Sequence, residues 1–342
     1  MRIAILTPTL LPFSGIDRLV EKEAERLSKG NSVDVFALRA EMKLKNVNVI
    51  EMGMPRNPFL ERAYRLFYFL DFIKIIRYTR RMKKYDRIIC HQYPMTIYGS
   101  LAKKMYGKEY IYHDAGIAYP HLFESVLERA YMRLFSLFTA MSIKNADGAI
   151  SISNFLKNEL KRDAGIESTV EYIEVDRKRF NKNIDGRNIR AKYKIKSGPL
   201  LLYVGRISPH KGIHLLIEAF GMIKKRIPEA KLMIVGKNTF NAYSERLKNL
   251  AKSSNLGESV LFAGFVKDDE LPQYYAACDA YTTATLWEGF DLPAVEAQCC
   301  GKPVVAFNLC SHPEVVKNGV LVKPGDTREF AEAVIGILKK RK

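Results

Sequence analysis

Short apolar runs alternate with longer stretches of helical periodicity along the whole chain, and this alternation limits the fold more than any other feature of the sequence. Each apolar run has the length of a buried strand, and each helical stretch is long enough to cross over to the next strand. Strands that alternate with helices in this way form parallel sheets covered by helices. We therefore predict an α/β protein.

The expected elements fall into two sets. The strands of the first set are 2–6, 32–37, 47–52, 86–90, 109–112, 148–152 and 169–173. Its helices are 16–28, 58–82, 94–106, 121–145 and 154–163. The strands of the second set are 200–204, 231–235, 260–263, 280–283, 303–306 and 319–322. Its helices are 210–225, 243–253, 268–277, 293–300 and 327–340.

Length and local composition divide the chain into two domains. Its 342 residues exceed the usual size of one domain, which is about 100 to 200 residues. The polar, strongly basic stretch 176–197 separates the two sets of strands. We predict Rossmann-like, doubly wound domains over 1–180 and 198–342, joined by a basic linker over 181–197. Two such domains facing each other place a ligand site in the cleft between them.

The net charge of +18 indicates an anionic partner. Residues 1–197 hold 36 Lys and Arg against 22 Asp and Glu, a net +14, and the remainder holds 19 against 15, a net +4. The excess therefore belongs mainly to the first half. No helix-turn-helix, zinc-finger or RNP-like pattern accompanies it, so we do not expect nucleic acid as the partner.

The basic excess peaks at 61–84, which holds eight basic and two acidic residues together with many aromatic and aliphatic ones. We expect this segment to be helical, and two interpretations stay open. The helix lies in the headgroup region of an anionic bilayer, where its aromatic rings and cations both find partners. Alternatively, it packs in the core and its basic end is solvated.

Cysteine usage and the N-terminus both indicate the cytoplasm. The five cysteines show no CxxC spacing and no neighbouring histidine pair, so the pattern supports neither a disulfide framework nor a zinc site. No apolar run approaches the ~20 residues of a membrane span, and the chain opens on a strand pattern rather than a signal peptide. The expected location is cytoplasmic, with peripheral attachment to the inner face of the cell membrane.

The first chemical motif, GRISPHKG, runs from Gly205 to Gly212 directly after an expected strand. Gly205 permits a sharp turn, and Arg206 and Lys211 place two cations beside a helix start, where phosphates also meet backbone N–H groups. Such a pair suits the stabilisation of a departing nucleotide, although loop cations are often only solvated. Neither GxGxxG nor GxxxxGK[ST] occurs in a matching context, so dinucleotide and P-loop sites lack their motifs.

The second motif, EGFDLPAVE, pairs two carboxylates, Glu288 and Glu296. Pro293 suits the first position of a helix, which puts the amides of Gly289 and Phe290 just ahead of a helix N-terminus. Glu296 then lies about one turn inside that helix, where it can reach the paired hydroxyls of a ribose. The simpler alternative is that both carboxylates only complement the helix dipole.

Together the motifs resemble the retaining glycosyltransferases of family 4, which have the GT-B fold. The resemblance is carried by GRISPHKG, by EGFDLPAVEA at 288–297 and by GKPVVA at 301–306. AGFV at 263–266 and LPQYYAACDAYTTAT at 271–285 fit the same family. Agreement is strong from about residue 198 to 326 and weaker before it, where ADGAISISNFLKNEL at 146–160 is similar to the end of the family's first domain.

The resemblance implies that the donor is a nucleotide-diphosphate sugar and that no metal is required. Arg206 and Lys211, after Gly205, would bind the diphosphate and stabilise the leaving nucleotide in place of a metal. No DxD motif occurs in the chain, which agrees with metal independence. His113, in the sequence HDAG, matches a first-domain histidine that approaches the transferred sugar, whereas a lone histidine at a strand end is more often structural.

The carboxylate motif carries the remaining implied contacts. Glu288 would contact the donor sugar, Gly289 and Phe290 would give their amides to the sugar or phosphate, and Glu296 would hold the ribose. Retention in this family is ascribed to attack from the face on which the phosphate leaves, so no protein nucleophile or general base is assigned. His113 then positions the sugar.

Four departures from the family pattern limit the carry-over. The loop after the first strand keeps a single glycine, Gly15, of the two that usually lie near the donor phosphates. The segment before the hinge reads IEVD at 173–176 and lacks its turn glycine. Cys310, Ser311 and His312 replace a paired glycine after GKPVVA. The chain stops at Lys342, where family members continue into a helix, so we expect either a short natural member or a trimmed terminus.

The sequence therefore predicts a metal-independent retaining hexosyltransferase of glycan biosynthesis. Its acceptor is expected on the basic first domain, either a glycan or a lipid-linked sugar at the cytoplasmic membrane face. Two other functions stay open: a GT-B-like epimerase or phosphorylase, and a non-catalytic protein that binds polyanions or a partner.

Overall fold

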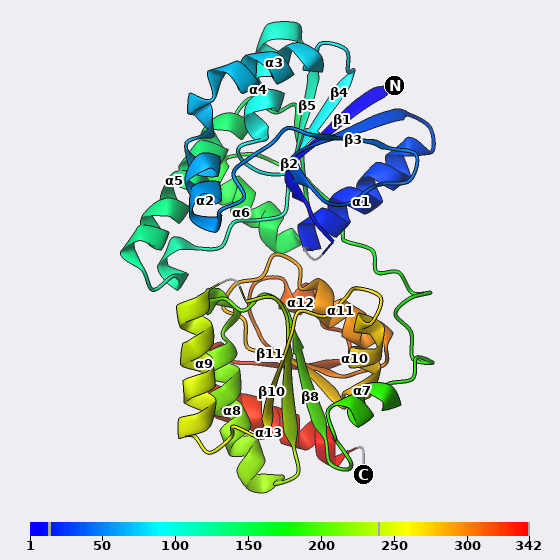
Figure 1. Ribbon diagram of the computed structural model, residues 1–342, viewed down its shortest axis with the longest axis vertical. Helices are drawn as coiled ribbons and strands as arrows, with labels where there is room; N and C mark the ends of the chain where they lie inside the picture. The colour runs from blue at the N-terminus through cyan, green and yellow to red at the C-terminus, as the bar shows by residue number, and fades with distance from the viewer. Residues whose placement is uncertain (13–14, 239, 341–342) are drawn as a thin grey trace. The chain divides into compact units, whose positions relative to one another are not determined.

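The computed structural model describes residues 1–12, 15–238 and 240–340 (Figure 1). The chain divides into two compact units, one of Met1–His121 with Ser125–Ile173 and one of Leu122–Glu124 with Glu174–Lys342. Each unit is a parallel sheet with helices on both faces. The predicted α/β class with two doubly wound domains is confirmed.

The first unit contains a seven-stranded sheet in the order β3-β2-β1-β4-β5-β6-β7, parallel throughout. Its strands are β1 (Arg2–Leu10), β2 (Ser32–Ala40), β3 (Asn48–Glu51), β4 (Arg87–Cys90), β5 (Glu109–Asp114), β6 (Gly148–Ser151) and β7 (Thr169–Val170). Each coincides with an expected strand. β1 and β2 extend further than expected because polar residues such as Thr9 and Arg39 remain paired in register beyond the apolar run.

Alternating side chains of β1 build the two cores of this unit. Ile3 and Ile5 pack in one apolar cluster with Val20 of α1 (Gly15–Ser28). Ala4 and Leu6 point to the opposite cluster, which includes aromatic residues from the helices on the other face. This alternation is the period-two pattern of a strand covered on both faces. The remaining α-helices of the unit are α2 (Pro58–Leu66), α3 (Phe72–Met82), α4 (Thr96–Tyr106), α5 (Val126–Ile143) and α6 (Asn154–Ala164).

The single helix expected over 58–82 is wrong, because the segment breaks into α2, a 3₁₀ turn (Tyr68–Leu70) and α3. Asp71 makes the break. Its carboxylate caps α3 by accepting from the Lys74 backbone N–H at 3.1 Å, and it also accepts from the Tyr64 hydroxyl at 2.6 Å. No glycine or proline marks this position, so periodicity alone did not reveal it.

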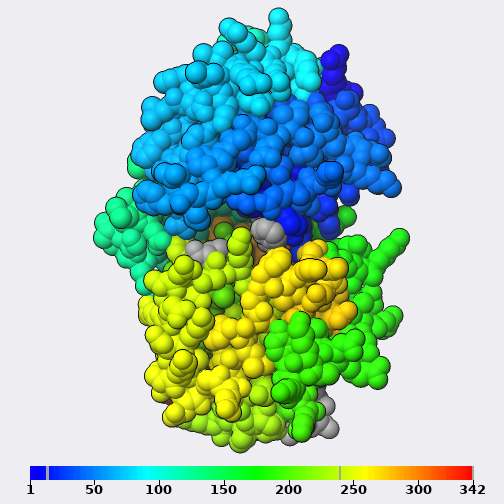
Figure 2. Space-filling model, in the orientation of Figure 1, coloured from blue at the N-terminus to red at the C-terminus, as the bar shows by residue number. Residues whose placement is uncertain are grey.

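The segment 58–84 has two apolar sides, so neither interpretation of it as a simple helix is complete. Leu66, Tyr68, Ile75, Tyr78 and Met82 are buried. Seven others are exposed by 46% to 84% and are named here the 59–76 apolar surface: Phe59, Leu60, Phe67, Leu70, Phe72, Ile73 and Ile76. Figure 2 shows this part of the chain, blue to cyan, on the visible surface of the first unit. No helix among the described residues has both the length and the apolar character needed to cross a bilayer.

The second unit contains a six-stranded parallel sheet in the order β10-β9-β8-β11-β12-β13. Its strands are β8 (Leu200–Val204), β9 (Lys231–Val235), β10 (Val260–Gly264), β11 (Ala280–Thr283), β12 (Val304–Phe307) and β13 (Gly319–Val322). Its α-helices are α7 (Arg187–Lys192), α8 (Ile213–Arg226), α9 (Asn241–Ser253), α10 (Leu271–Ala277), α11 (Leu292–Cys299), α12 (His312–Val315) and α13 (Thr327–Lys339). One face packs against α8, α9 and α13, the other against α7, α10 and α11 (Figure 1).

Residues 181–197, expected as a basic linker, are not a bare connection. They contain α7, and Ile189 and Ile195 lie in the core of the second unit. The Arg190 guanidinium donates to the carbonyl of Ala277 at 2.9 Å and to a carboxylate oxygen of Asp279 at 2.5 Å. α7 has six residues, fewer than two turns, and contains one of the two apolar anchors. Such a short helix cannot display a helical period, so the sequence pattern showed only the charge.

Candidate functional site

Two loops of the second unit meet where its strand order reverses. The loop 205–212 follows β8, and the loop 284–291 follows β11, the strand hydrogen-bonded directly to β8. Outward from this pair the order runs to β9 on one side and to β12 on the other. In doubly wound sheets, ligands bind outside the carboxyl ends of the strands at such a reversal. Both sequence motifs therefore lie at the position where this fold binds ligands.

The two loops are in direct backbone contact. The Leu286 N–H donates to the His210 carbonyl at 2.8 Å, and the Thr285 hydroxyl lies 3.1 Å from the same oxygen. Gly212 has φ +59°, and a Cβ placed on it would lie 1.9 Å from the Ala284 carbonyl oxygen. Only glycine fits that approach. The loop that carries Arg206 and Lys211 is thereby fixed against the loop that carries Glu288.

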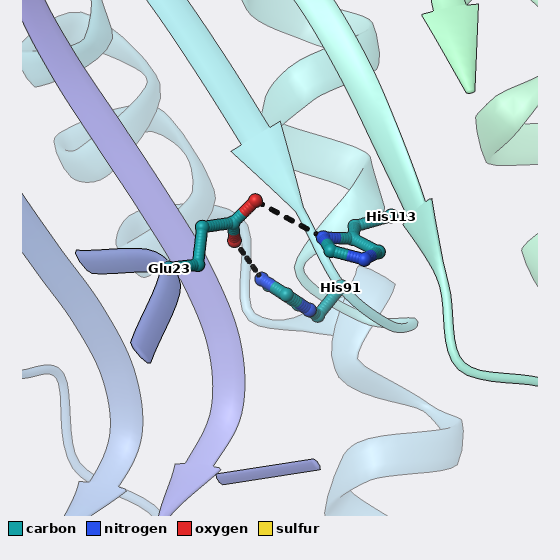
Figure 3. A group of neighbouring side chains, drawn as sticks. All are labelled: Glu23, His91 and His113. Atoms are coloured by element: carbon teal, nitrogen blue, oxygen red, sulfur yellow. Dashed lines mark hydrogen bonds and ion pairs between the residues drawn. The ribbon is translucent and has the colours of Figure 1, made fainter. Parts of the chain in front are cut away.

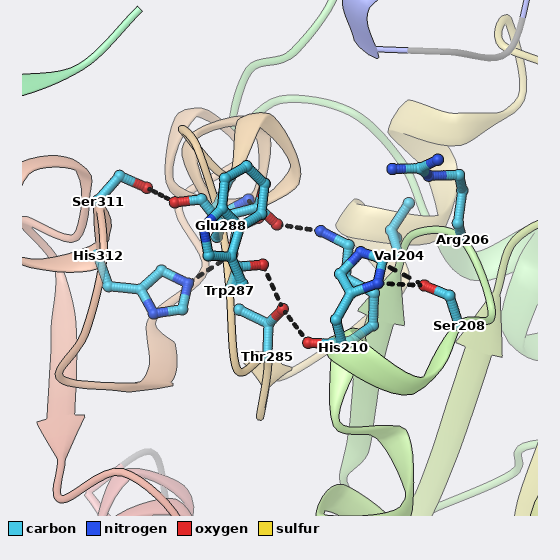
Figure 4. Close-up of polar contacts among 12 residues, drawn as sticks. Val204, Arg206, Ser208, His210, Thr285, Trp287, Glu288, Ser311 and His312 are labelled. Carbon is cyan, nitrogen blue, oxygen red and sulfur yellow. Dashed lines mark hydrogen bonds and ion pairs between the residues drawn. The ribbon is translucent and has the colours of Figure 1, made fainter. Parts of the chain in front are cut away.

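Lys211 and Glu288 form an ion pair across the loops. The two side chains are only 13% and 17% exposed. In Figure 4 the Glu288 side chain faces the loop after β8, and its backbone carbonyl faces Ser311. An anionic ligand can bind here if it replaces the Glu288 carboxylate as the partner of the partly desolvated Lys211 ammonium. The structure thus brings together one of the two expected cations and one of the two expected carboxylates.

Arg206 lies on the same loop and is solvent-exposed. Figure 4 shows its guanidinium turned to the side on which Glu288 lies. The charges of Arg206 and Glu288 both act on the hydroxyl of Tyr203, a residue of β8. Burial raises the pKa of the Tyr203 hydroxyl well above its usual range, Glu288 and Asp291 raise it further, and Arg206 opposes them. These charges therefore act on the same hydroxyl at the end of β8.

Glu296, the second expected carboxylate, is buried on α11. It accepts a hydrogen bond from the Tyr275 hydroxyl at 2.7 Å. Burial raises the pKa of the Tyr281 hydroxyl on β11 well above its usual range. Asp291 and Tyr203 raise it further, and smaller contributions come from the two motif carboxylates, Glu288 and Glu296. Gly289 and Phe290 are buried just ahead of the helix. The expected one-turn spacing of Glu296 into α11 is confirmed.

Asp291 and His312 hold the carboxylate loop, a role that was not predicted for either residue from the sequence. Asp291 has φ +58°, caps α11 by accepting from the Ala294 N–H at 3.1 Å, and meets His312 Nε2 at 2.9 Å. Ser311 donates to the Glu288 carbonyl at 3.1 Å. An Asp before a Leu-Pro helix start is a capping signal. The substitution at 310–312, taken as a weakness of the match, instead supplies two supports for the loop.

The remaining two expected residues belong to the first unit. Gly15 is the first residue of α1, and a Cβ placed there would meet nothing within 4 Å. His113 is in β5 and is only 2% exposed. Its Nδ1 lies 3.0 Å from Glu23 Oε1, and His91 Nε2 lies 2.7 Å from Glu23 Oε2 (Figure 3). Glu23 and His91 were not predicted: Glu23 lies in a run of charged residues on α1 that gives it no distinguishing pattern, and His91 is a single histidine after an apolar strand.

The comparisons with known proteins identify the family. "Glycosyltransferase Family 4" matches residues 13–174, and "Glycosyl transferases group 1" matches residues 185–342. The chain therefore belongs to the family 4 glycosyltransferases, whose fold is GT-B.

Individual relatives agree with this placement. A GDP-mannose-dependent alpha-(1-6)-phosphatidylinositol monomannoside mannosyltransferase of Mycobacterium tuberculosis is 30% identical over 203 residues, which cover 56% of this chain and 52% of that protein. The chain thus spans about half the length of this curated relative. The structure of sucrose-phosphate synthase from Thermosynechococcus elongatus superposes with a TM-score of 0.83 at 22% identity, covering 99% of this chain and 90% of that one. Anabaena HepE in complex with UDP-glucose gives 0.81 at 21% identity, covering 100% and 90%.

Proposed function

We propose that this protein is a retaining glycosyltransferase that moves a sugar from a nucleotide-diphosphate donor to an acceptor. The observation that carries the proposal is the Lys211–Glu288 ion pair, held between two loops at the strand reversal of the second unit. The second unit is the donor domain, and the first unit is the acceptor domain.

In this proposal the incoming diphosphate takes the Lys211 ammonium from Glu288. Arg206 and Lys211 then stabilise the charge that develops on the leaving nucleotide, so no metal is required for departure. Glu288, released from the lysine, accepts from hydroxyls of the donor sugar. Gly205, Gly289 and Phe290 line the phosphate and sugar.

The other three residues complete the donor contacts. Glu296 binds the ribose hydroxyls from within α11. Gly15, at the N-terminus of α1, lets the donor phosphates approach a helix end. His113 positions the transferred sugar.

Charge-neutralising substitutions test the donor site. Lys211→Ala and Glu288→Gln each lower kcat/KM for sugar transfer by about 10²- to 10³-fold, the usual loss when one transition-state contact is removed. Lys225→Ala, which removes an exposed lysine on α8, leaves transfer unchanged. Undiminished turnover in Lys211→Ala and Glu288→Gln would contradict the proposal and favour a non-catalytic binding protein.

The donor itself is tested by a panel. The names of two similar proteins mention GDP-mannose and UDP-glucose, so these two nucleotide sugars and their free nucleotide diphosphates are the first probes. A donor raises the melting temperature because it binds only the folded protein. Analysis of labelled products separates transfer with retention from epimerisation or phosphorolysis, and either of the latter two would overturn the assigned reaction.

We further propose that the acceptor is a lipid-linked sugar on an anionic membrane, met by the 59–76 apolar surface. Exposed arginines and lysines flank this surface: Arg56, Arg77, Arg80, Arg81, Lys83 and Lys84. Apolar side chains that enter the headgroup region, with cations beside them, match an anionic bilayer. The chain beside this surface contacts α5, since the Phe69 and Phe138 rings lie 5.4 Å apart. α5 adds an exposed apolar side chain of its own, Leu127, which is 81% exposed.

Vesicle flotation tests the membrane proposal. The protein is expected to float with vesicles that contain anionic lipid and to stay in the dense fraction with zwitterionic ones. The double variant Ile73→Glu/Ile76→Glu loses flotation, because it places carboxylates in the surface that enters the bilayer. Met105→Glu is the matched control, since Met105 is 59% exposed on α4. Flotation that ignores lipid charge, or that survives the double variant, would remove the argument.

A further inference from the structure

The buried cluster of Glu23, His91 and His113 lies at the strand reversal of the first sheet. Its strand order reverses between β1 and β4, so the carboxyl ends of these strands define the ligand-binding edge. Glu23 is on α1, the helix that follows β1. His91 directly follows β4, and His113 is in the adjacent β5. Three chemistry-bearing side chains from separate elements therefore converge at one edge.

The hydrogen bonds of the cluster determine where its protons lie. Burial opposes ionisation of Glu23, but the charge of the two histidines whenever they are protonated, and the hydrogen bonds that they donate, both lower its pKa. The carboxylate is thus ionised, and each of its oxygens accepts from one ring: Oε2 from His91 Nε2 and Oε1 from His113 Nδ1. Burial also lowers the pKa of His91, although Glu23 opposes this effect. The inner nitrogens therefore carry the protons.

The outer nitrogens are left as bare acceptors. His91 Nδ1 and His113 Nε2 are buried and have no hydrogen-bond partner among the residues that the structure describes. Protonating either ring would place a charged N–H where no acceptor faces it, which costs more than an unused lone pair. The cluster is thus a carboxylate shared by two neutral imidazoles, each with a lone pair on its far side (Figure 3).

A metal ion fits this cluster poorly, even though its ligand atoms lie within 4.8 Å of one another. The two rings are stacked, with centroids 4.7 Å apart and planes 27° from parallel, so their lone pairs run side by side instead of converging on one point. Metal binding would also move each proton to the outer nitrogen, where metal-bound histidines need an acceptor. Neither outer nitrogen has such an acceptor within residues 1–12, 15–238 and 240–340.

We propose that Glu23 is a positioning residue, which fixes His113 in the Nδ1–H tautomer so that Nε2 accepts a hydrogen bond from a hydroxyl of the transferred sugar. This inference rests on the proposed function. When a carboxylate accepts a hydrogen bond from one nitrogen of a neutral imidazole, the other nitrogen carries no proton and can only accept a hydrogen bond. His91 shares the same carboxylate and holds its second oxygen in place, so Glu23 cannot rotate away from His113.

Nitrogen-15 NMR of histidine-labelled protein tests the tautomer without any activity. His113 is expected to carry its ring proton on Nδ1 and to leave Nε2 as an acceptor, and His91 is expected to carry its ring proton on Nε2. The signals are assigned by their loss in His113→Asn and His91→Asn. A proton on His113 Nε2, or a doubly protonated His113, would overturn the proposal. So would Zn²⁺ binding that shifts both ring signals in wild-type protein and not in Glu23→Gln.

Glu23→Gln tests the consequence for the reaction. The amide offers one acceptor and one donor, so at least one histidine must switch tautomer. Transfer of the sugar to water, measured with GDP-mannose and UDP-glucose, is expected to fall at least about tenfold in kcat, as when an orienting partner of a functional histidine is lost. Binding of the nucleotide diphosphate, read from thermal shift, stays unchanged because Glu23 acts through His113, which this proposal assigns to the transferred sugar and not to the diphosphate. Glu25→Gln, an exposed carboxylate on the same helix, is the matched control.

The outcomes separate the two proposals. If no nucleotide diphosphate raises the melting temperature of the wild-type protein, the proposed function fails while the tautomer measurement still stands. If binding and turnover are present and Glu23→Gln matches Glu25→Gln in kcat, the positioning role is wrong.

Discussion

His312 shows most clearly how a single residue shapes the site. Its Nδ1 lies 2.7 Å from the Phe307 carbonyl and its Nε2 lies 2.9 Å from Asp291. Both partners are acceptors, and only the imidazolium has two N–H donors to satisfy them. Burial lowers the pKa of His312, but the hydrogen bond and charge of Asp291 outweigh burial, so the pKa stands above its ordinary 6.5. The proton on His312 therefore holds Asp291, which caps α11.

This arrangement predicts a pH dependence of stability. Because the folded pKa of His312 is raised, its contribution is fully present below the unfolded pKa of about 6.5 and is lost as pH rises through the higher folded value. Urea unfolding between pH 6 and 9 is expected to show a steeper fall in unfolding free energy for the wild-type protein than for His312→Gln. The exposed His121→Gln should track wild type. Parallel wild-type and His312→Gln curves would contradict the assignment.

Gly212 gives a second prediction at this scale. In Gly212→Ala the new methyl group would lie 1.9 Å from the Ala284 oxygen, so the two loops must separate. We expect a loss of at least about 2 kcal/mol of unfolding free energy, in the range of substitutions that strain a special backbone position. Chemical denaturation measures it. Gly257→Ala, where the nearest atom is 3.8 Å from the added carbon, should cost far less.

At the scale of elements, apolar periodicity predicted the strands of both sheets. It did not predict the helix break that a polar residue makes or the short helix in the basic segment. It found both sheets because a covered strand must be apolar along its length, as β8 and β9 are. It joined α2 to α3 because the hydrophobic period continues through the break that Asp71 makes. It predicted a linker over 181–197 because the two apolar anchors of this segment, Ile189 in α7 and Ile195 after it, are too few to form a pattern.

The capping role of Asp71 is the prediction at this scale. Asp71→Ala removes the acceptor of the Lys74 N–H and of the Tyr64 hydroxyl. Loss of an N-cap costs about 1 to 2 kcal/mol, so the unfolding free energy of the first unit is expected to fall by that amount, which lowers its urea midpoint. Asp269→Ala removes an exposed carboxylate and serves as the control. An unchanged midpoint in Asp71→Ala would mean that the break between α2 and α3 is set by packing alone.

At the scale of the whole molecule, each unit has its own sheet, its own apolar cores and its own strand reversal. Ligand binding to one reversal is therefore expected to be measurable separately from the other. Hydrogen exchange in the presence of UDP or GDP should slow in 205–212 and 284–297, the loops that carry the donor site. The protection should disappear in Lys211→Ala and persist in Lys225→Ala. Protection spread evenly over the second sheet would indicate binding elsewhere.

The sequence predicts those residues of the candidate site that belong to short motifs. Lys211 and Glu288 belong to such motifs, and the structure joins them. His312, Glu23 and His91 act through partners that only folding brings near, and so does Asp291 in its contact with His312. Glu23 lies 68 residues from His91 and 90 from His113 along the chain. No local pattern encodes a contact over such separations.

The supports behind the carboxylate loop have a consequence for selectivity. Ser311 and the charged His312 hold the Glu288 loop from the side of β12, so contacts within the protein fix the shape of the loop. A rigid receptor pays little ordering entropy on association. A rigid site also excludes ligands of the wrong shape, because its conformation does not change to accommodate them. A nucleotide sugar with one misplaced hydroxyl should therefore be refused at binding, before any bond is broken.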